Sequence, residues 1–136
     1  MTAKEFLQQA YIAHNEVEMK LEELERLRSL SERTTSKLNK IFVRSSKDNS
    51  KIETAVALIE EQTERLAEEV LKLLEIGKNV AIAIKQVQNP SERNLLEYRY
   101  LCFFSWQQIA TLMKASQRQI FRLHNQALKN FGSKCQ

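Results

Sequence analysis

Glycine and proline are scarce in this 136-residue chain, which contains two glycines and one proline. Tight turns, hairpins and the glycine-rich loops that hold phosphate groups need these residues at defined positions. The scarcity therefore excludes a nucleotide-binding loop and favours long helices. We expect an all-α fold.

Residues that carry catalysis or bind metals are also few. The chain has two histidines and two cysteines, which lack metal-ligand spacing, and a single aspartate, Asp48. A nucleophilic triad or a zinc site needs several such residues to converge. We predict a protein that is not an enzyme and that binds neither a metal nor a cofactor.

Long apolar segments are missing as well, since no uninterrupted apolar run is longer than five residues, the length of the run at 80–84. A membrane-spanning helix needs about 20 apolar residues. Residues 1–5 contain no apolar signal region. We expect no membrane contact, a cytoplasmic location, and reduced cysteines rather than a disulfide framework.

The net charge of +4 is unevenly distributed along the chain. Residues 1–90 contain 14 Lys or Arg and 15 Asp or Glu, whereas residues 91–136 contain seven basic and two acidic residues. A basic surface attracts nucleic acid because it raises the local affinity for phosphate. The C-terminal third is therefore the part of the chain where a nucleic-acid site is expected.

Five pairs of residues have the spacing of an N-terminal capping box, with Ser, Thr or Asn followed three positions later by Glu or Gln. They are Thr2 with Glu5, Ser50 with Glu53, Asn89 with Glu92, Ser105 with Gln108, and Ser116 with Gln119. Pro90 suits a first helical position, and Gly132 predicts the end of the last helix. The pattern predicts long helices at about 3–42 and 51–88, followed by shorter ones.

The second long segment has an apolar residue at every seventh position, which is typical of a helix that supercoils around a partner. The stripe is Ile52, Ile59, Leu66, Leu73, Val80 and Val87, with companions expected at Ala55, Gln62, Glu69, Ile76 and Ala83. The first segment has a looser stripe: Leu7, Ala10, His14, Val17, Leu21, Leu24, Leu27, Leu30, Thr34, Leu38 and Ile41. Its step from Leu24 to Leu27 is expected to break the heptad phase. Together the two segments predict an antiparallel coiled-coil hairpin as a domain of residues 1–88.

Basic residues cluster around the loop expected at 43–49, where Asp48 is the one acidic residue between positions 33 and 51. They are Arg33, Lys37, Lys40, Arg44, Lys47 and Lys51. Such a cluster is either a solvated surface or a second contact to DNA or to an acidic protein.

Residues 105–123 have the pattern of a helix-turn-helix, in which two short helices are joined by a tight turn. The turn at 113–115 lacks the usual glycine, so either Lys114 or Ala115 adopts a less favourable backbone conformation or the turn is wound differently. The surface expected to bind DNA consists of Gln117, Arg118, Phe121, Arg122, Asn125 and Lys129, with Lys114 in the turn. Gln and Asn side chains pair with adenine, and Arg pairs with guanine or phosphate.

The domain expected at 89–136 resembles the C-terminal DNA-binding region, region 4, of sigma-70-type factors, which recognises the −35 promoter element. The resemblance rests on Leu95–Leu96–x–Tyr98–Arg99–Tyr100, Ser105–Trp106–x–x–Ile109–Ala110, and Ser116, Ile120, Leu123, Ala127 and Leu128. The whole chain is similar to small sigma-like proteins encoded by bacteriophages and prophages, which are related to late transcription regulators of the ArpU and RinA type. The resemblance implies double-stranded promoter DNA and host RNA polymerase as partners. No segment resembles the sigma region that binds the −10 element, so it implies regulation rather than promoter opening.

A second class of function stays open, namely a helical adaptor or a DNA-packaging component. Small phage terminase subunits combine a helix-turn-helix with an oligomerising helical body. A large closed ring of chains would favour packaging, whereas a monomer or a homodimer would favour regulation.

Overall fold

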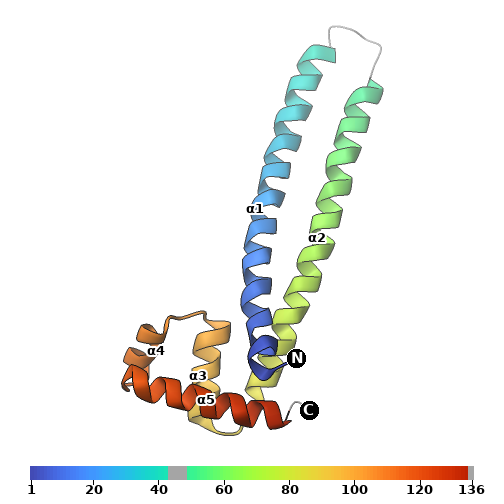
Figure 1. Cartoon of the computed structure of the whole chain (residues 1–136). Coiled ribbons are helices and arrows are strands. Elements are labelled where there is room, and N and C mark those ends of the chain that lie inside the picture. Colours follow the sequence, from blue (N-terminus) through green and yellow to red (C-terminus); the bar gives the residue numbers. More distant parts are fainter. Residues whose placement is uncertain (43–48, 135–136) are drawn as a thin grey trace. The chain divides into compact units, whose positions relative to one another are not determined.

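The computed structural model describes residues 1–42 and 49–134, and over these ranges the regular structure is helical (Figure 1). The elements are α1 (Ala3–Phe42), α2 (Asn49–Lys85), α3 (Pro90–Leu96), the π-helical turn η1 (Glu97–Leu101), α4 (Trp106–Leu112) and α5 (Gln117–Lys134). The predicted all-α class is confirmed for this part of the chain. Arg44 and Lys47 of the basic cluster lie outside it. None of the helices within 1–42 and 49–134 is long and apolar enough to cross a membrane.

Of the two long helices, α1 follows its predicted bounds more closely, since it runs from Ala3 to Phe42 as expected. Helix α2 begins at Asn49, one residue before the predicted cap Ser50, and the Ser50 carbonyl accepts a hydrogen bond from Thr54 Oγ1 at 2.8 Å. It ends at Lys85 rather than near residue 88. The chain tightens there, because the Val87 amide donates to the Ile84 carbonyl three residues back.

Three of the predicted capping boxes form, at Thr2, Ser105 and Ser116. At Asn89 only half of the box forms: the Asn89 side chain accepts hydrogen bonds from two backbone amides of α3. The Glu92 carboxylate is bonded instead to Asn130 of α5, at 2.8 Å. The helix end predicted at Gly132 is wrong, because α5 continues to Lys134 and Gly132 keeps a negative φ.

The chain divides into two compact units. Residues 1–15 and 73–136 form the terminal unit, and residues 16–72 form the central unit. The boundary predicted between the domains 1–88 and 89–136 falls inside the terminal unit, because the ends of α1 and α2 share a core with the later helices. That core contains Leu7, Val80, Leu96, Tyr100 and Phe131, among other residues.

The start of α1 packs on the end of α5 within the terminal unit. The rings of Phe6 and Phe131 lie 5.8 Å apart. A second contact comes from Phe103, whose ring stacks on His14 with a centroid distance of 4.5 Å and lies 5.6 Å from Tyr11. Phe103 has a φ of 61°, an uncommon conformation for a bulky residue. We attribute this conformation to the packing of its ring against α1.

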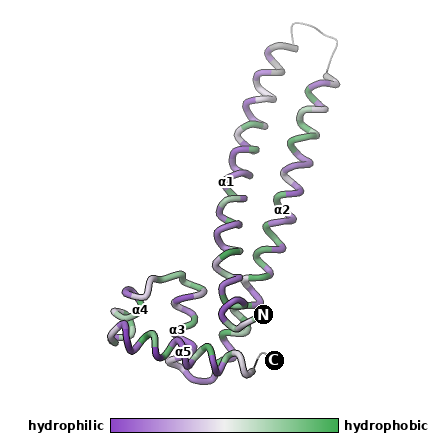
Figure 2. Tube along the Cα trace, viewed as in Figure 1, coloured by the Kyte–Doolittle hydropathy of each residue, from purple (hydrophilic) through white to green (hydrophobic). Residues whose placement is uncertain are grey.

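Helix α2 alternates apolar and polar residues along its length (Figure 2). Its predicted main stripe, from Ile52 to Val87, is half-buried or buried throughout. Of the predicted companions, Ala55, Glu69 and Ala83 are half-buried, whereas Gln62 and Ile76 are exposed. The residues one position later are half-buried or buried throughout: Val56, Thr63, Val70, Gly77 and Ile84. Heptad geometry permits companions at either a three- or a four-residue step, and the four-residue step places Val70 and Ile84 inside.

The phase break predicted between Leu24 and Leu27 of α1 is wrong. From Ala10 on, one series of buried or half-buried residues alternates steps of three and four without interruption: Ala10, Ala13, Val17, Lys20, Leu24, Leu27, Ser31 and Thr34. Ala13, Lys20 and Ser31 take the places predicted for His14, Leu21 and Leu30, and both of these leucines are more than two-fifths exposed. Lysine can occupy such a stripe because its apolar stem packs while the ammonium group reaches a partner.

In the central unit α1 and α2 run antiparallel. The Lys20 Nζ atom lies 2.7 Å from Glu69 Oε2. Farther along the two helices, Leu24 and Leu27 of α1 and Ile59 of α2 line the same groove. The hydrogen bond between Lys20 and Glu69 lowers the pKa of Glu69 and raises the pKa of Lys20. Among the described residues of this unit, Val17 and Val70 are the buried hydrophobic ones.

Candidate nucleic-acid interface

The candidate interface consists of α4, a four-residue turn and α5. The Gln108 amide donates to Ser105 Oγ at the start of α4, and the Gln119 amide donates to Ser116 Oγ at the start of α5, at 3.2 and 3.1 Å. Between the helices Lys114 has a φ of 53°, and the Ala115 amide donates to the Ala110 carbonyl. Of the two predicted alternatives for the glycine-free turn, the left-handed residue is therefore the one that forms. Its cost is about 1–2 kcal/mol relative to an ordinary conformation.

A compact apolar cluster holds α4 and α5 together against α3. Its buried members are Leu95, Ile109, Ala110 and Ile120. The half-buried side chains of Tyr98, Phe104, Trp106, Met113, Ala115 and Leu123 pack around them. The small Ala110 side chain permits close approach of the two helices. Because this cluster fixes one face of α5, the opposite face is left to solvent.

All seven residues predicted from the sequence to bind DNA are exposed. Arg118, Arg122, Asn125 and Lys129 recur at steps of three and four and so share one face of α5. Gln117 and Phe121 lie toward one side of that face, and Lys114 lies in the preceding turn. The structure therefore brings six of the residues together on one helix and adds the seventh next to its N-terminus.

Two other basic residues of the C-terminal third have structural contacts. Arg99 is half-buried, and its guanidinium carbon lies 4.3 Å above the ring centroid of Trp106. Its Nη1 atom also donates to the Phe104 carbonyl at 3.0 Å. Arg93 Nη1 donates to the Val87 carbonyl just beyond α2, also at 3.0 Å. These two arginines therefore contribute less to an exposed basic face than the sequence count suggests.

His124 is buried on the inner face of α5. No structural role was predicted for this residue from the sequence. Its Nε2 atom lies 2.8 Å from the Tyr100 hydroxyl, and its ring meets Trp106 at 4.7 Å. Burial, with smaller contributions from Lys4 and Arg99, lowers the pKa of His124 to about 4. Burial likewise raises the pKa of Tyr100. At neutral pH the imidazole is therefore uncharged, and its Nε2 atom shares a hydrogen bond with the Tyr100 hydroxyl. The sequence signal for this burial is spacing: His124 follows the buried Ile120 by four positions, so the two lie on the same face of the helix.

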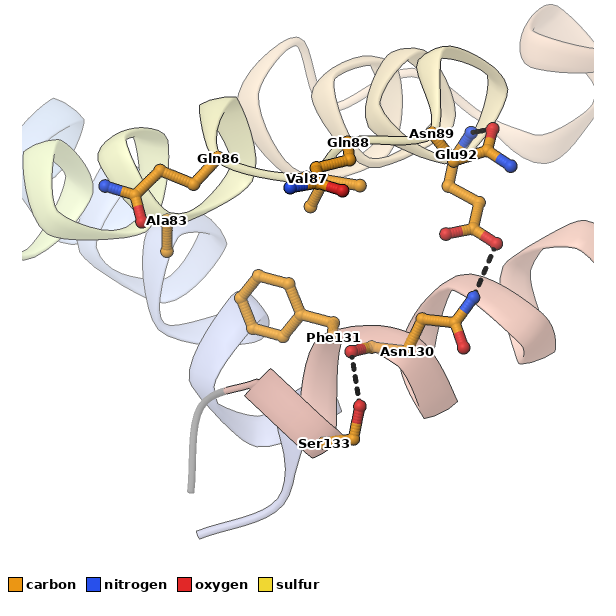
Figure 3. A pocket seen from close by; sticks show the side chains of 9 residues that line it. All are labelled: Ala83, Gln86, Val87, Gln88, Asn89, Glu92, Asn130, Phe131 and Ser133. Atoms are coloured by element: carbon orange, nitrogen blue, oxygen red, sulfur yellow. Dashed lines mark hydrogen bonds between the residues drawn. The ribbon is translucent and has the colours of Figure 1, made fainter.

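A cleft of about 500 Å³ lies beside the C-terminal half of α5, where α2 ends and α3 begins (Figure 3). It is lined by Ala83, Gln86, Val87, Gln88, Asn89, Glu92, Asn130, Phe131 and Ser133. Glu92 is 2% exposed, and its carboxylate accepts a hydrogen bond from Asn130 Nδ2. This bond links the first turn of α3 to α5. Over the ranges that the structure covers, no group of three or more His, Cys, Asp or Glu residues is placed to hold a metal ion.

No family model matches the chain, and none of the curated proteins or solved structures that were compared with it matches it either. The residues and the geometry of the interface therefore carry the functional inference.

Proposed function

We propose that the chain is a sequence-specific, DNA-binding transcription regulator, in which α4 and α5 act as a helix-turn-helix and α5 enters the major groove. The observation that carries the proposal is the exposed face of α5, which offers arginine, lysine and amide groups together. No acidic residue follows Glu97 in the sequence. A surface with this composition attracts phosphate and has the donors that base edges require.

The N-terminal half of α5 is the part that would recognise bases. Residues near the start of a recognition helix contact base edges. In α5 these residues would be Gln117, Arg118 and Arg122. Asn125 lies one turn farther along on the same face. Lys114 and Lys129, at the two ends of the exposed face, would bind phosphate groups and fix the register of the helix on the duplex.

The resemblance to sigma region 4 supports promoter-like DNA of phage or prophage genes as the target, with host RNA polymerase as a second partner in the cytoplasm. Binding rather than catalysis would be its mode of action. The chain would regulate a polymerase that opens the promoter by other means, in agreement with the lack of a segment resembling the −10-binding region.

Exposed apolar side chains on α2 favour a homodimer. Leu71 and Leu74, three positions apart and so neighbours on one side of the helix, are each more than half exposed, and the central unit has few buried hydrophobic residues among those described. A heptad-patterned helix with such a surface gains free energy when a coiled-coil partner covers it. Dimeric helix-turn-helix proteins bind two half-sites, so a dimer would favour a palindromic target.

Replacing Arg118 by alanine tests the proposed recognition face. We expect the affinity for a duplex enriched from random sequence by the wild-type chain to fall by about 1–3 kcal/mol, with relaxed preference at one base pair. Fluorescence anisotropy on the parent duplex and its single-base variants measures both effects. Arg65→Ala is the matched control, since Arg65 is an exposed arginine on α2. Equal affinity of Arg118→Ala and the wild type would remove Arg118 from the interface.

A further inference from the structure

Phe121 is an aromatic residue among the charged and amide side chains of the exposed α5 face, and 43% of it is exposed. It follows Arg118 by three positions and directly precedes Arg122. Residues three apart on a helix are surface neighbours. An exposed apolar ring beside a guanidinium group gains free energy when another apolar group covers it. Its position therefore indicates a ligand that presents an apolar group next to a hydrogen-bond acceptor or anionic group for Arg118.

The Phe121 ring is held in place from behind. Trp106 meets it edge-on, with a centroid distance of 5.3 Å and an interplanar angle of 65°. Trp106 itself lies under the Arg99 guanidinium and against the His124 ring. Because each member of this series is fixed by the next, Phe121 is presented in a defined position. Little side-chain freedom is then lost when a ligand covers the ring.

We infer that Phe121 is a specificity-determining residue that contacts the C5 methyl group of thymine in the major groove. The inference rests on the proposed function, since it requires α5 to lie in that groove. The thymine methyl group is the apolar group that base edges present there, and it distinguishes thymine from the other bases. Arg118 and Arg122 supply the neighbouring contacts to guanine or phosphate.

Deoxyuridine substitution tests the contact, because it removes the C5 methyl group and leaves the base-pairing edge unchanged. The probe is the duplex enriched by the wild-type chain, with each thymine replaced in turn. We expect wild-type affinity to fall about threefold to tenfold at one or two thymines, as for the loss of one buried methyl group. Phe121→Ala is expected to bind the parent duplex more weakly and to bind the parent and those deoxyuridine duplexes equally. Arg118→Ala is the control and should keep the methyl dependence.

Two results would overturn the inference while leaving the proposed function in place. One is equal wild-type affinity for the parent duplex and every deoxyuridine duplex, a comparison that needs no variant. The other is a Phe121→Ala or Phe121→Leu protein that retains the full loss at the same thymines. Phe121→Leu keeps an apolar side chain next to Trp106. This variant provides the test if Phe121→Ala does not fold. A wild-type chain that enriches no duplex at all would overturn both the inference and the proposed function.

Discussion

Ile120→Ala is expected to lower the free energy of unfolding by about 2–5 kcal/mol. Ile120 is 1% exposed and packs with Leu95, Ile109 and Ala110 in the cluster that holds α4 and α5 together. Truncation leaves a cavity there, since neighbouring side chains relax only partly to fill it. Urea denaturation followed by the fluorescence of Trp106, the one tryptophan of the chain, reports the loss directly.

Ile82→Ala is the matched control for this substitution. Ile82 belongs to the same unit but is 47% exposed on α2. We expect a clearly smaller loss of stability, because less apolar surface returns to water. Equal losses for the two variants would contradict the packing of α5 against α3 and α4.

Acidification from pH 7 to pH 4 is expected to remove about 3 kcal/mol of stability through His124 alone. In the unfolded chain its pKa lies near 6.5, and in the folded chain burial lowers it to about 4. Between these values the unfolded state binds a proton that the folded state does not bind, so the free energy of unfolding falls as the pH falls. The groups that face the imidazole are Tyr100, Trp106, Lys4 and Arg99.

The measurement is the free energy of unfolding against pH, for the wild type and for His124→Gln. The variant loses some stability at pH 7 because the contacts with Tyr100 and Trp106 change. Its curve should nevertheless be flatter than that of the wild type between pH 6.5 and pH 4. Parallel curves for the two proteins would show that His124 takes up its proton equally well in both states.

The features that follow from local sequence could be predicted. Helix α1 and the exposed face of α5 obey the helical period, and the boxes at Ser105 and Ser116 involve residues three apart. The left-handed turn at Lys114 was one of two alternatives that the missing glycine allowed. In each case the determining groups lie within one or two helical turns of one another.

The features that depend on distant residues could not be predicted. Lys20 takes a stripe position because Glu69, on another helix, accepts its hydrogen bond. Glu92 leaves its capping box for Asn130, and Arg99 stacks on Trp106 instead of facing solvent. The sequence suggests a polar surface position for each of these residues, and only the packing of the helices supplies their partners.

The central claim is that α5 recognises a DNA sequence, and in vitro selection from a pool of random duplexes tests it most directly. The wild-type chain and the double variant Arg118→Ala, Arg122→Ala are carried through the same rounds, with the fold of each checked by circular dichroism. We predict that the wild type enriches one sequence motif and that the double variant enriches none. A folded wild-type chain that enriches no motif, or a double variant that enriches the same motif equally well, would contradict the account.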